Sequence, residues 1–146
     1  MNVEVLIGTP LQEVFDFCGG FIEEPRKIIM GGPMMGVAQY TLESSVLKQN
    51  NALLALTDRQ AQEKPESVCI RCGRCVLVCP MSLLPLYINS NVMRGNLEEL
   101  EKYHPNDCME CGSCSYICPA SRHLTQSIRQ AKAELRKMSN REKGGN

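Results

Sequence analysis

The pattern of apolar and polar positions over residues 1–56 predicts a small α/β unit. Three short apolar runs, at residues 3–7, 27–30 and 52–56, are typical of β-strands. The last run is continuously apolar, which is typical of a buried strand. The loop at residues 31–36 is rich in glycine but lacks the residue order of the nucleotide-binding loops, so we expect a tight structural turn.

One helix is predicted between the first two runs. Its apolar face recurs at helical spacing and comprises Leu11, Val14, Phe15 and Cys18. Thr9 is expected to cap this helix, with Pro10 as its first residue and Gln12 completing a capping box. Gly19 and Gly20 are expected to end it. Because Cys18 belongs to the apolar face, it is expected to be a buried and unreactive thiol.

The remainder of the chain has a different pattern. Residues 57–67 are polar and contain Pro65, which is typical of a linker. Residues 68–138 show helical rather than strand periodicity, so a mainly α-helical domain is predicted there. The fold class predicted for the whole chain is therefore α+β. Residues 139–146 are polar and are expected to form a frayed tail.

Three helices are predicted within residues 68–138. Apolar residues near Leu83 indicate one that ends at Gly95. Asn96 is placed to cap the next, with Glu99 as its third residue, and Pro105 prevents its continuation. The apolar stripe of the third helix comprises Leu124, Ile128, Ala131, Leu135 and Met138. Its wetter side carries Arg129, Lys132, Arg136 and Lys137.

Charge is unevenly distributed, although sixteen basic residues balance sixteen acidic ones. Residues 1–120 hold nine Lys/Arg against fourteen Asp/Glu, whereas residues 121–146 hold seven against two. This basic end could meet an anionic membrane or an acidic partner, but an ordinary solvated helix face is the simpler interpretation. It lacks interleaved aromatic residues, and no nucleic acid is expected as a partner.

The chain has no sign of a membrane span or a secretory leader. No apolar run approaches the ~18 residues that a transmembrane helix needs, so no transmembrane segment is expected. The first residues lack a basic stretch followed by an apolar one. A cytosolic chain keeps its thiols reduced, which favours ligation of a metal or cluster over disulfides.

Eight of the nine cysteines form two copies of one pattern, in which three cysteines are spaced by two residues and a fourth precedes a proline. The copies, offset by 39 residues, are Cys69, Cys72, Cys75 and Cys79, then Cys108, Cys111, Cys114 and Cys118. This run holds a [4Fe–4S] cluster, so its duplication predicts two clusters and electron transfer. Gly73 and Gly112 occupy matching places, where the backbone is expected to pass close to a cluster.

Each cluster is expected to take its fourth ligand from the other copy, because the cysteine before proline does so in two-cluster ferredoxins. The first cluster is assigned to Cys69, Cys72, Cys75 and Cys118. The second cluster is assigned to Cys108, Cys111, Cys114 and Cys79. No side chain is expected to perform acid–base catalysis. Arg71 and Arg74 lie between ligands and should stabilise the reduced, more negative state of a cluster.

The cysteines have a second possible interpretation, and two histidines lie near them in the sequence. The cysteines could hold zinc, but structural zinc sites use two cysteine pairs per ion, which leaves the third cysteine of each copy without a purpose. His104 and His123 lie near cluster ligands in the sequence. For both, a surface or capping role is expected rather than tuning of a cluster.

The order of motifs in this chain carries a family resemblance. The motifs that precede the cysteine runs are Gly8-Thr9-Pro10-Leu11, Cys18-Gly19-Gly20 and Gly31-Gly32-Pro33-Met34-Met35-Gly36. In this order, over about residues 2–138, the chain resembles the C subunit of the Rnf (Rsx) electron transport complex. Many ferredoxins share the cysteine runs alone, and the combination with the glycine-rich loop is more specific.

The resemblance implies a fold and a place of work. It implies a β-grasp unit of the soluble-ligand-binding type at residues 1–56, followed by a helical domain with two [4Fe–4S] clusters. It also implies a peripheral subunit on the cytoplasmic side of the cell membrane, with other subunits of the complex and ferredoxin as partners. The family's complex moves electrons between reduced ferredoxin and NAD and couples this to Na+ or H+ transport.

Family members also carry a preceding domain that binds FMN and NADH, and this chain begins near the expected β-grasp unit. We therefore expect a piece of a longer ferredoxin:NAD oxidoreductase subunit that relays electrons without oxidising or reducing NAD(H) itself. FMN and NADH would bind only in such an upstream domain. Cobalamin reductases of bacterial microcompartments are similar and provide one alternative. A zinc-stabilised interaction module is another.

Overall fold

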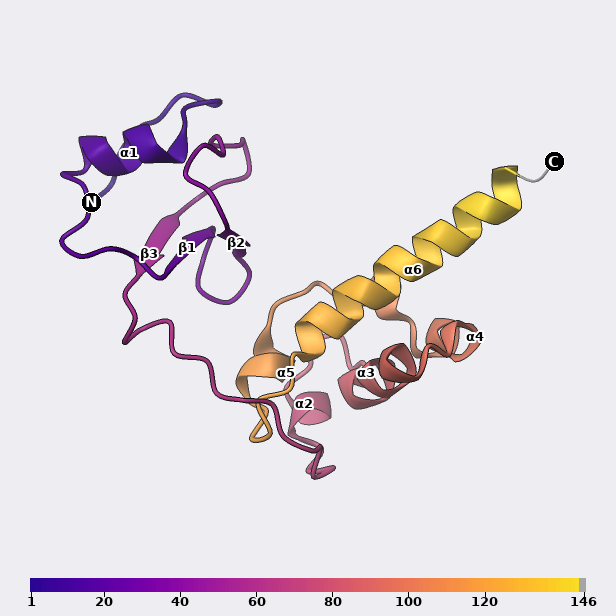
Figure 1. The fold of residues 1–146 in the computed structure, drawn as a ribbon. Helices are drawn as coiled ribbons and strands as arrows, with labels where there is room; N and C mark the ends of the chain where they lie inside the picture. Colours follow the sequence, from indigo (N-terminus) through magenta and orange to yellow (C-terminus); the bar gives the residue numbers. More distant parts are fainter. Residues whose placement is uncertain (145–146) are drawn as a thin grey trace. The chain divides into compact units, whose positions relative to one another are not determined.

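The computed structural model describes residues 1–144, which fall into two compact units. The first is Met1–Glu63, and the second begins at Lys64. In Figure 1 the strands that the structure describes lie in the first unit and the longer helices in the second. The predicted combination of helices with a small sheet is confirmed, while the β-grasp arrangement stays a prediction.

A three-stranded antiparallel sheet forms the centre of the first unit. Its strands are β1 (Lys27–Met30), β2 (Val37–Gln39) and β3 (Leu53–Leu56), in the order β2-β1-β3. The predicted strand at 27–30 is the central one and pairs with both neighbours. β3 is half-buried rather than buried, because it lies at an edge of a small sheet. The sequence did not predict β2, which is only three residues long and follows a turn-rich loop.

The strand predicted at residues 3–7 is wrong. The backbone there has no strand pairing, and the side chains of Leu6 and Ile7 are exposed. Pairing with a later segment starts only at Gly8, whose N–H donates to the Val46 carbonyl at 2.9 Å. An apolar run forms a strand only where a neighbouring strand accepts its hydrogen bonds, and that partner begins too late for residues 3–7.

Helix α1 (Leu11–Phe17) confirms the predicted helix but not its predicted cap. Pro10 stands at the N-cap and no side chain caps the first turn. The Thr9 hydroxyl instead donates to the Leu6 carbonyl at 2.9 Å. The Gln12 amide donates to the Asp16 carboxylate at 2.9 Å, so it cannot complete a capping box. The side chains of Thr9 and Gln12 therefore bond to Leu6 and Asp16 instead of forming the predicted capping box.

Cys18 is exposed, so the prediction of a buried thiol is wrong. The helix stops at Phe17, and Gly19 and Gly20 follow in the left-handed region, as the glycine pair predicted. The Gly20 N–H donates to the Phe15 carbonyl at 2.9 Å and closes the turn. Cys18 thus lies in the turn after the helix and is no longer part of the buried helix face.

The loop at residues 31–36 is a tight turn, as predicted. The Gly36 N–H donates to the Gly32 carbonyl at 2.8 Å. A Cβ added at Gly36 would lie 2.4 Å from Cγ2 of Ile29 and 2.5 Å from the Gly32 oxygen. Any side chain at this position would therefore push the turn away from β1.

Replacing Gly36 with alanine is accordingly expected to destabilise the first unit by roughly 1–3 kcal/mol. Gly32 offers a matched control, because a Cβ added there meets nothing within 4 Å. Amide hydrogen exchange across β1 and β2 under native conditions measures both changes. Faster exchange in Gly36→Ala but not in Gly32→Ala is expected, and equal exchange in the two variants would contradict this account of the turn.

The second unit is built from helices of very different length. They are α2 (Arg74–Leu77), α3 (Pro85–Arg94), α4 (Leu97–Leu100), α5 (Ser113–Tyr116) and α6 (Leu124–Gly144), with 3-10 turns at Glu101–Tyr103 and Pro105–Asp107. Gly95 ends α3, and the Asn96 side chain caps α4 by accepting the Glu99 N–H at 3.4 Å. Both predictions for these helix ends are confirmed.

Helices α3 and α6 pack against each other and form the core of the second unit. The predicted apolar stripe of α6 is confirmed, since Leu124, Ile128, Ala131 and Leu135 are all buried. Ile88 of α3 and Leu100 of α4 complete this core. A buried polar link joins the two long helices, in which the Asn89 amide donates to the Ser127 hydroxyl at 2.7 Å.

Helix α6 extends beyond its predicted end at Met138 to Gly144. The start of the predicted frayed tail is therefore helical, and residues 145–146 lie outside the described residues. Over the part of the chain that the structure describes, no helix combines the length and apolar character needed to cross a membrane.

Candidate iron–sulfur cluster sites

The two cysteine runs repeat in three dimensions as they do in sequence. Helices α2 and α5 are both four residues long and start at the same place in each copy. Each follows a glycine in the left-handed region, Gly73 with φ 75° and Gly112 with φ 82°. A residue with a side chain would be strained there. In the structure this glycine pair forms the turn at the start of each short helix, while its predicted close approach to a cluster stays a prediction.

Backbone N–H groups point at cysteine sulfurs at matching positions in the two copies. The Arg71 N–H donates to Cys69 Sγ at 3.4 Å, and the Glu110 N–H donates to Cys108 Sγ at 3.3 Å. Both donors adopt positive φ, 55° and 57° respectively. In each copy, the residue in the left-handed conformation directs its N–H toward the sulfur of the cysteine two positions earlier. Such donors stabilise negative charge on a thiolate or on a cluster that it binds.

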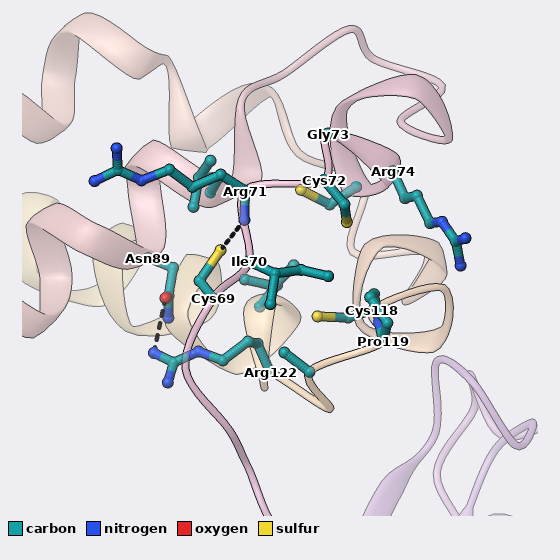
Figure 2. A pocket seen from close by; sticks show the side chains of 14 residues that line it. Cys69, Ile70, Arg71, Cys72, Gly73, Arg74, Asn89, Cys118, Pro119 and Arg122 are labelled. Atoms are coloured by element: carbon teal, nitrogen blue, oxygen red, sulfur yellow. Dashed lines mark hydrogen bonds between the residues drawn. The ribbon is translucent and has the colours of Figure 1, made fainter.

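Four predicted ligands of the first cluster line a single pocket, with about 410 Å³ of empty space when its solvent-facing part is included. Three come from one cysteine run, Cys69, Cys72 and Cys75, and the fourth is Cys118 from the other run. Figure 2 shows Cys69, Cys72 and Cys118 placed around this pocket. The structure therefore brings together the residues of the exchanged ligand set. We call this group the first cluster site.

The second set of predicted ligands is brought together by the same exchange, and we call it the second cluster site. Burial raises the pKa of the Cys108 thiol, and the negative charge of Cys79, from the other run, raises it further. Burial likewise raises the pKa of Cys114, the most buried of these ligands. Hydrogen bonding with Ser113 lowers the pKa of Cys111. Buried thiolates of this kind need a compensating positive charge, which the iron of a bound cluster would supply.

A basic residue that the sequence did not single out lies at the first site. The Arg122 side chain is 19% exposed and lines the pocket. Its Nη2 donates to Asn89 Oδ1 at 3.0 Å, and its Nη1 lies 3.4 Å from the Glu66 carboxylate. Figure 2 shows Arg122 turned toward Asn89, while Arg71 and Arg74 extend outward from the cysteines. Arg71 and Arg74 also line this pocket, and their effect on the reduced state of a cluster stays a prediction.

An ion-pair group next to the second site was also missed. The Lys132 ammonium donates to the Cys108 carbonyl at 2.6 Å and to the Glu110 carboxylate at 2.7 Å. Arg129 donates to the same carboxylate at 2.8 Å. These contacts lower the pKa of Glu110, with the Lys132 hydrogen bond as the main cause. The expectation that Lys132 lies on a solvated face is wrong, since its side chain is only 12% exposed.

The donor sets fit [4Fe–4S] clusters. Each site brings four thiols together near cationic side chains or backbone N–H donors. At the first site, the Nε of Arg122 is buried without a hydrogen-bond partner in the described part of the chain. A sulfur-rich anionic group in this pocket would give that donor a partner. Among the described residues, no three His, Cys, Asp or Glu side chains are placed to hold a single metal ion.

The two histidines lie outside both ligand sets. His104 is exposed and sits in the left-handed region between the two 3-10 turns. His123 has a side chain that is 55% exposed, and its backbone N–H donates to the Glu66 carboxylate at 2.7 Å. Both histidines are exposed, which agrees with the expected surface position.

Two known families match separate parts of the chain. Residues 68–121 match the 4Fe-4S dicluster domain, and residues 1–38 match the SLBB domain. The chain is thus similar to 4Fe-4S dicluster domains over its cysteine runs and to SLBB domains over its first residues.

Curated relatives give the particular protein to which the chain is similar. The C subunit of the proton-translocating ferredoxin:NAD(+) oxidoreductase complex of Clostridium ljungdahlii is 50% identical over 97% of this chain, which spans 31% of that relative. The C subunit of the Na(+)-translocating complex of Acetobacterium woodii is 49% identical over 98% of this chain, which spans 32% of it. The C subunit of the ion-translocating oxidoreductase complex of Rhodobacter capsulatus is 47% identical over 96% of this chain, which spans 27% of it.

The predicted resemblance to the C subunit of the Rnf complex is therefore confirmed. The chain spans about a third of the length of the curated relatives it matches.

Proposed function

We propose that this chain is the electron-relay part of a C subunit, in which single electrons pass between two neighbouring [4Fe–4S] clusters. The first cluster would be held by Cys69, Cys72, Cys75 and Cys118, and the second by Cys108, Cys111, Cys114 and Cys79. The observation that supports this proposal is the pocket in which Cys118 of the second run lies with Cys69, Cys72 and Cys75 of the first. When each run supplies one ligand to the cluster of the other run, the two clusters are held close together, as electron hopping requires.

The chain's own residues bind the clusters, orient them and set their electrostatics. The clusters supply one-electron oxidation and reduction when bound. The Arg71 and Glu110 amides donate to ligand sulfurs, and the Leu83 N–H donates to Cys79 Sγ at 3.4 Å. Hydrogen bonds to sulfur and nearby cations favour the more negative, reduced state. No proton transfer is needed, because only an electron enters and leaves.

The larger assembly is proposed from the relatives. Their printed names describe proton- or Na(+)-translocating ferredoxin:NAD(+) oxidoreductase complexes. In such a complex this part would sit peripherally on the cytoplasmic side of the membrane, among other subunits and ferredoxin. FMN and NADH would bind to a preceding domain of the whole subunit. The matches favour this assignment over the cobalamin reductase and zinc-module alternatives.

The first unit is proposed to be a β-grasp unit that serves as a subunit interface. Its surface carries large apolar side chains in full solvent contact, among them Ile22 and Tyr40. Exposed apolar groups of this size are typical of surfaces that another protein covers.

Electron paramagnetic resonance of the fully reduced chain tests the relay. Two reduced cubanes at hopping distance are expected to give a spectrum broadened by magnetic coupling between their spins. A chain in which Cys72 is replaced by serine should lose the first cluster and leave the simple spectrum of one isolated cluster. A wild-type spectrum that equals the sum of two uncoupled clusters would contradict the proposed relay.

A further inference from the structure

The two cluster sites differ in charge although their backbones repeat. The first site has three basic residues, and none of them has a basic counterpart 39 residues away in the second site. Arg71 corresponds to Glu110, Arg74 to Ser113 and Arg122 to Leu83. Ser82 and Ser121, the residues directly before Leu83 and Arg122, both have a φ angle of 51°, so the backbone conformation repeats there as well. The difference between Arg122 and Leu83 is therefore one of side chain and not of fold.

Arg122 is the basic residue best placed to act on the first site. The side chains of Arg71 and Arg74 extend outward from the cysteines (Figure 2), where water and salt screen their charge. The terminal nitrogens of Arg122 already face Asn89 and Glu66. The Arg122 Nε–H, in contrast, belongs to a buried nitrogen that has no partner in the described residues, on a side chain that lines the pocket. A buried donor without an acceptor is costly, which points to a missing acceptor.

We infer that the Nε–H of Arg122 donates to the first cluster or to one of its thiolates, and that Arg122 stabilises the reduced state of that cluster selectively. This inference rests on the proposed function. Reduction adds one electron and one unit of negative charge, with no bond broken and no proton moved. A half-buried cation that lines the pocket and holds an unpartnered N–H favours the product of that step. At the second site Leu83 contributes a backbone N–H but no charge.

At both sites a carboxylate is paired with basic residues. Glu66 partly compensates Arg122 at the first site, and Glu110 compensates Lys132 and Arg129 at the second. Lys132 already donates to a carbonyl and a carboxylate, both within 2.7 Å. What distinguishes Arg122 is its unused buried donor, so it is a tuning residue for one cluster and not for both.

The test is a redox titration of the anaerobically purified chain, followed by electron paramagnetic resonance. Arg122→Gln is expected to lower the reduced-to-oxidised ratio of the first cluster about tenfold at a fixed potential, or about 59 mV for one electron. The midpoint of the second cluster should move much less. The cluster that is lost in Cys72→Ser identifies which midpoint belongs to the first site. Arg122→Lys, which keeps the charge but loses the planar donor, should fall between Arg122→Gln and the wild type.

Glu66→Gln separates tuning from loss of structure. Both variants break the pair between Arg122 and Glu66, but removal of the carboxylate should raise the reduced fraction, the opposite of Arg122→Gln. The glutamine oxygen can still accept the His123 N–H. Shifts of the same sign in both variants, or an unchanged first midpoint in Arg122→Gln with a full iron content, would overturn the inference. Absence of cluster signals in the wild type would overturn the proposed function as well.

Discussion

Replacing Cys118 with alanine is expected to remove the cluster that Cys69, Cys72 and Cys75 hold, and to leave the other cluster in place. Cys118 lies in the same pocket as those three residues. Its negative charge also contributes to the raised pKa of Cys75, of which burial is the main cause. Iron content should fall from about eight to about four atoms per chain. Replacing Cys79 should remove the other cluster, since Cys79 stands beside Cys108.

Paired substitutions make this experiment decisive. If the ligands are exchanged, Cys118→Ala combined with Cys72→Ala touches one cluster only, and about four iron atoms should remain. Cys118→Ala combined with Cys111→Ala touches both clusters, and almost no iron should remain. Ligand sets confined to a single run predict the reverse order of the two double variants. That reverse order would show that the exchanged assignment is wrong.

Removal of the clusters is expected to unfold the cysteine segments of the second unit and to spare the first unit. Helices α2 and α5 have four residues each, far fewer than an isolated helix needs in water, and α2 contains no buried residue. The ligands must therefore supply much of the stability of these segments. In zinc-finger peptides the comparable coupling of metal binding to folding amounts to about 10–16 kcal/mol.

Hydrogen exchange before and after anaerobic removal of iron measures this effect. Amides of α2 and α5 should lose their protection by orders of magnitude, while those of β1 and β3 stay unchanged and provide the internal control. Helix α6 should keep part of its protection, because Ile128 and Leu135 also pack with Ile88 and Leu100, which are not cluster ligands. Full protection of both cysteine segments in the iron-free chain would contradict the proposed role of the clusters in folding.

The sequence predicted those features that depend on spacing within one element. The stripe of Leu124 and Ile128, the cap at Asn96 and the stop at Gly95 are all local, and each is confirmed. The exchanged cysteines could be predicted because the family of two-cluster ferredoxins fixes the pattern, although the ligand assignment itself stays a prediction.

Features that depend on a distant partner could not be predicted. β2 exists because β1 offers it a free edge, and the run at residues 3–7 failed because its potential partner starts too late. Lys132 was expected in water because its partner, Glu110, lies 22 positions away on a turn. The same holds for Arg122, whose contacts with Asn89 and Glu66 arise only when α3 and the linker region meet the start of α6.

The central claim is that the paired cysteine runs hold two [4Fe–4S] clusters. Measurement of iron, acid-labile sulfide and zinc in the anaerobically purified chain tests it most directly. About eight iron and eight sulfide per chain, with little zinc, is the predicted result. Zinc with little iron in freshly prepared anaerobic protein would contradict it, and would make the second unit a structural metal domain instead of an electron relay.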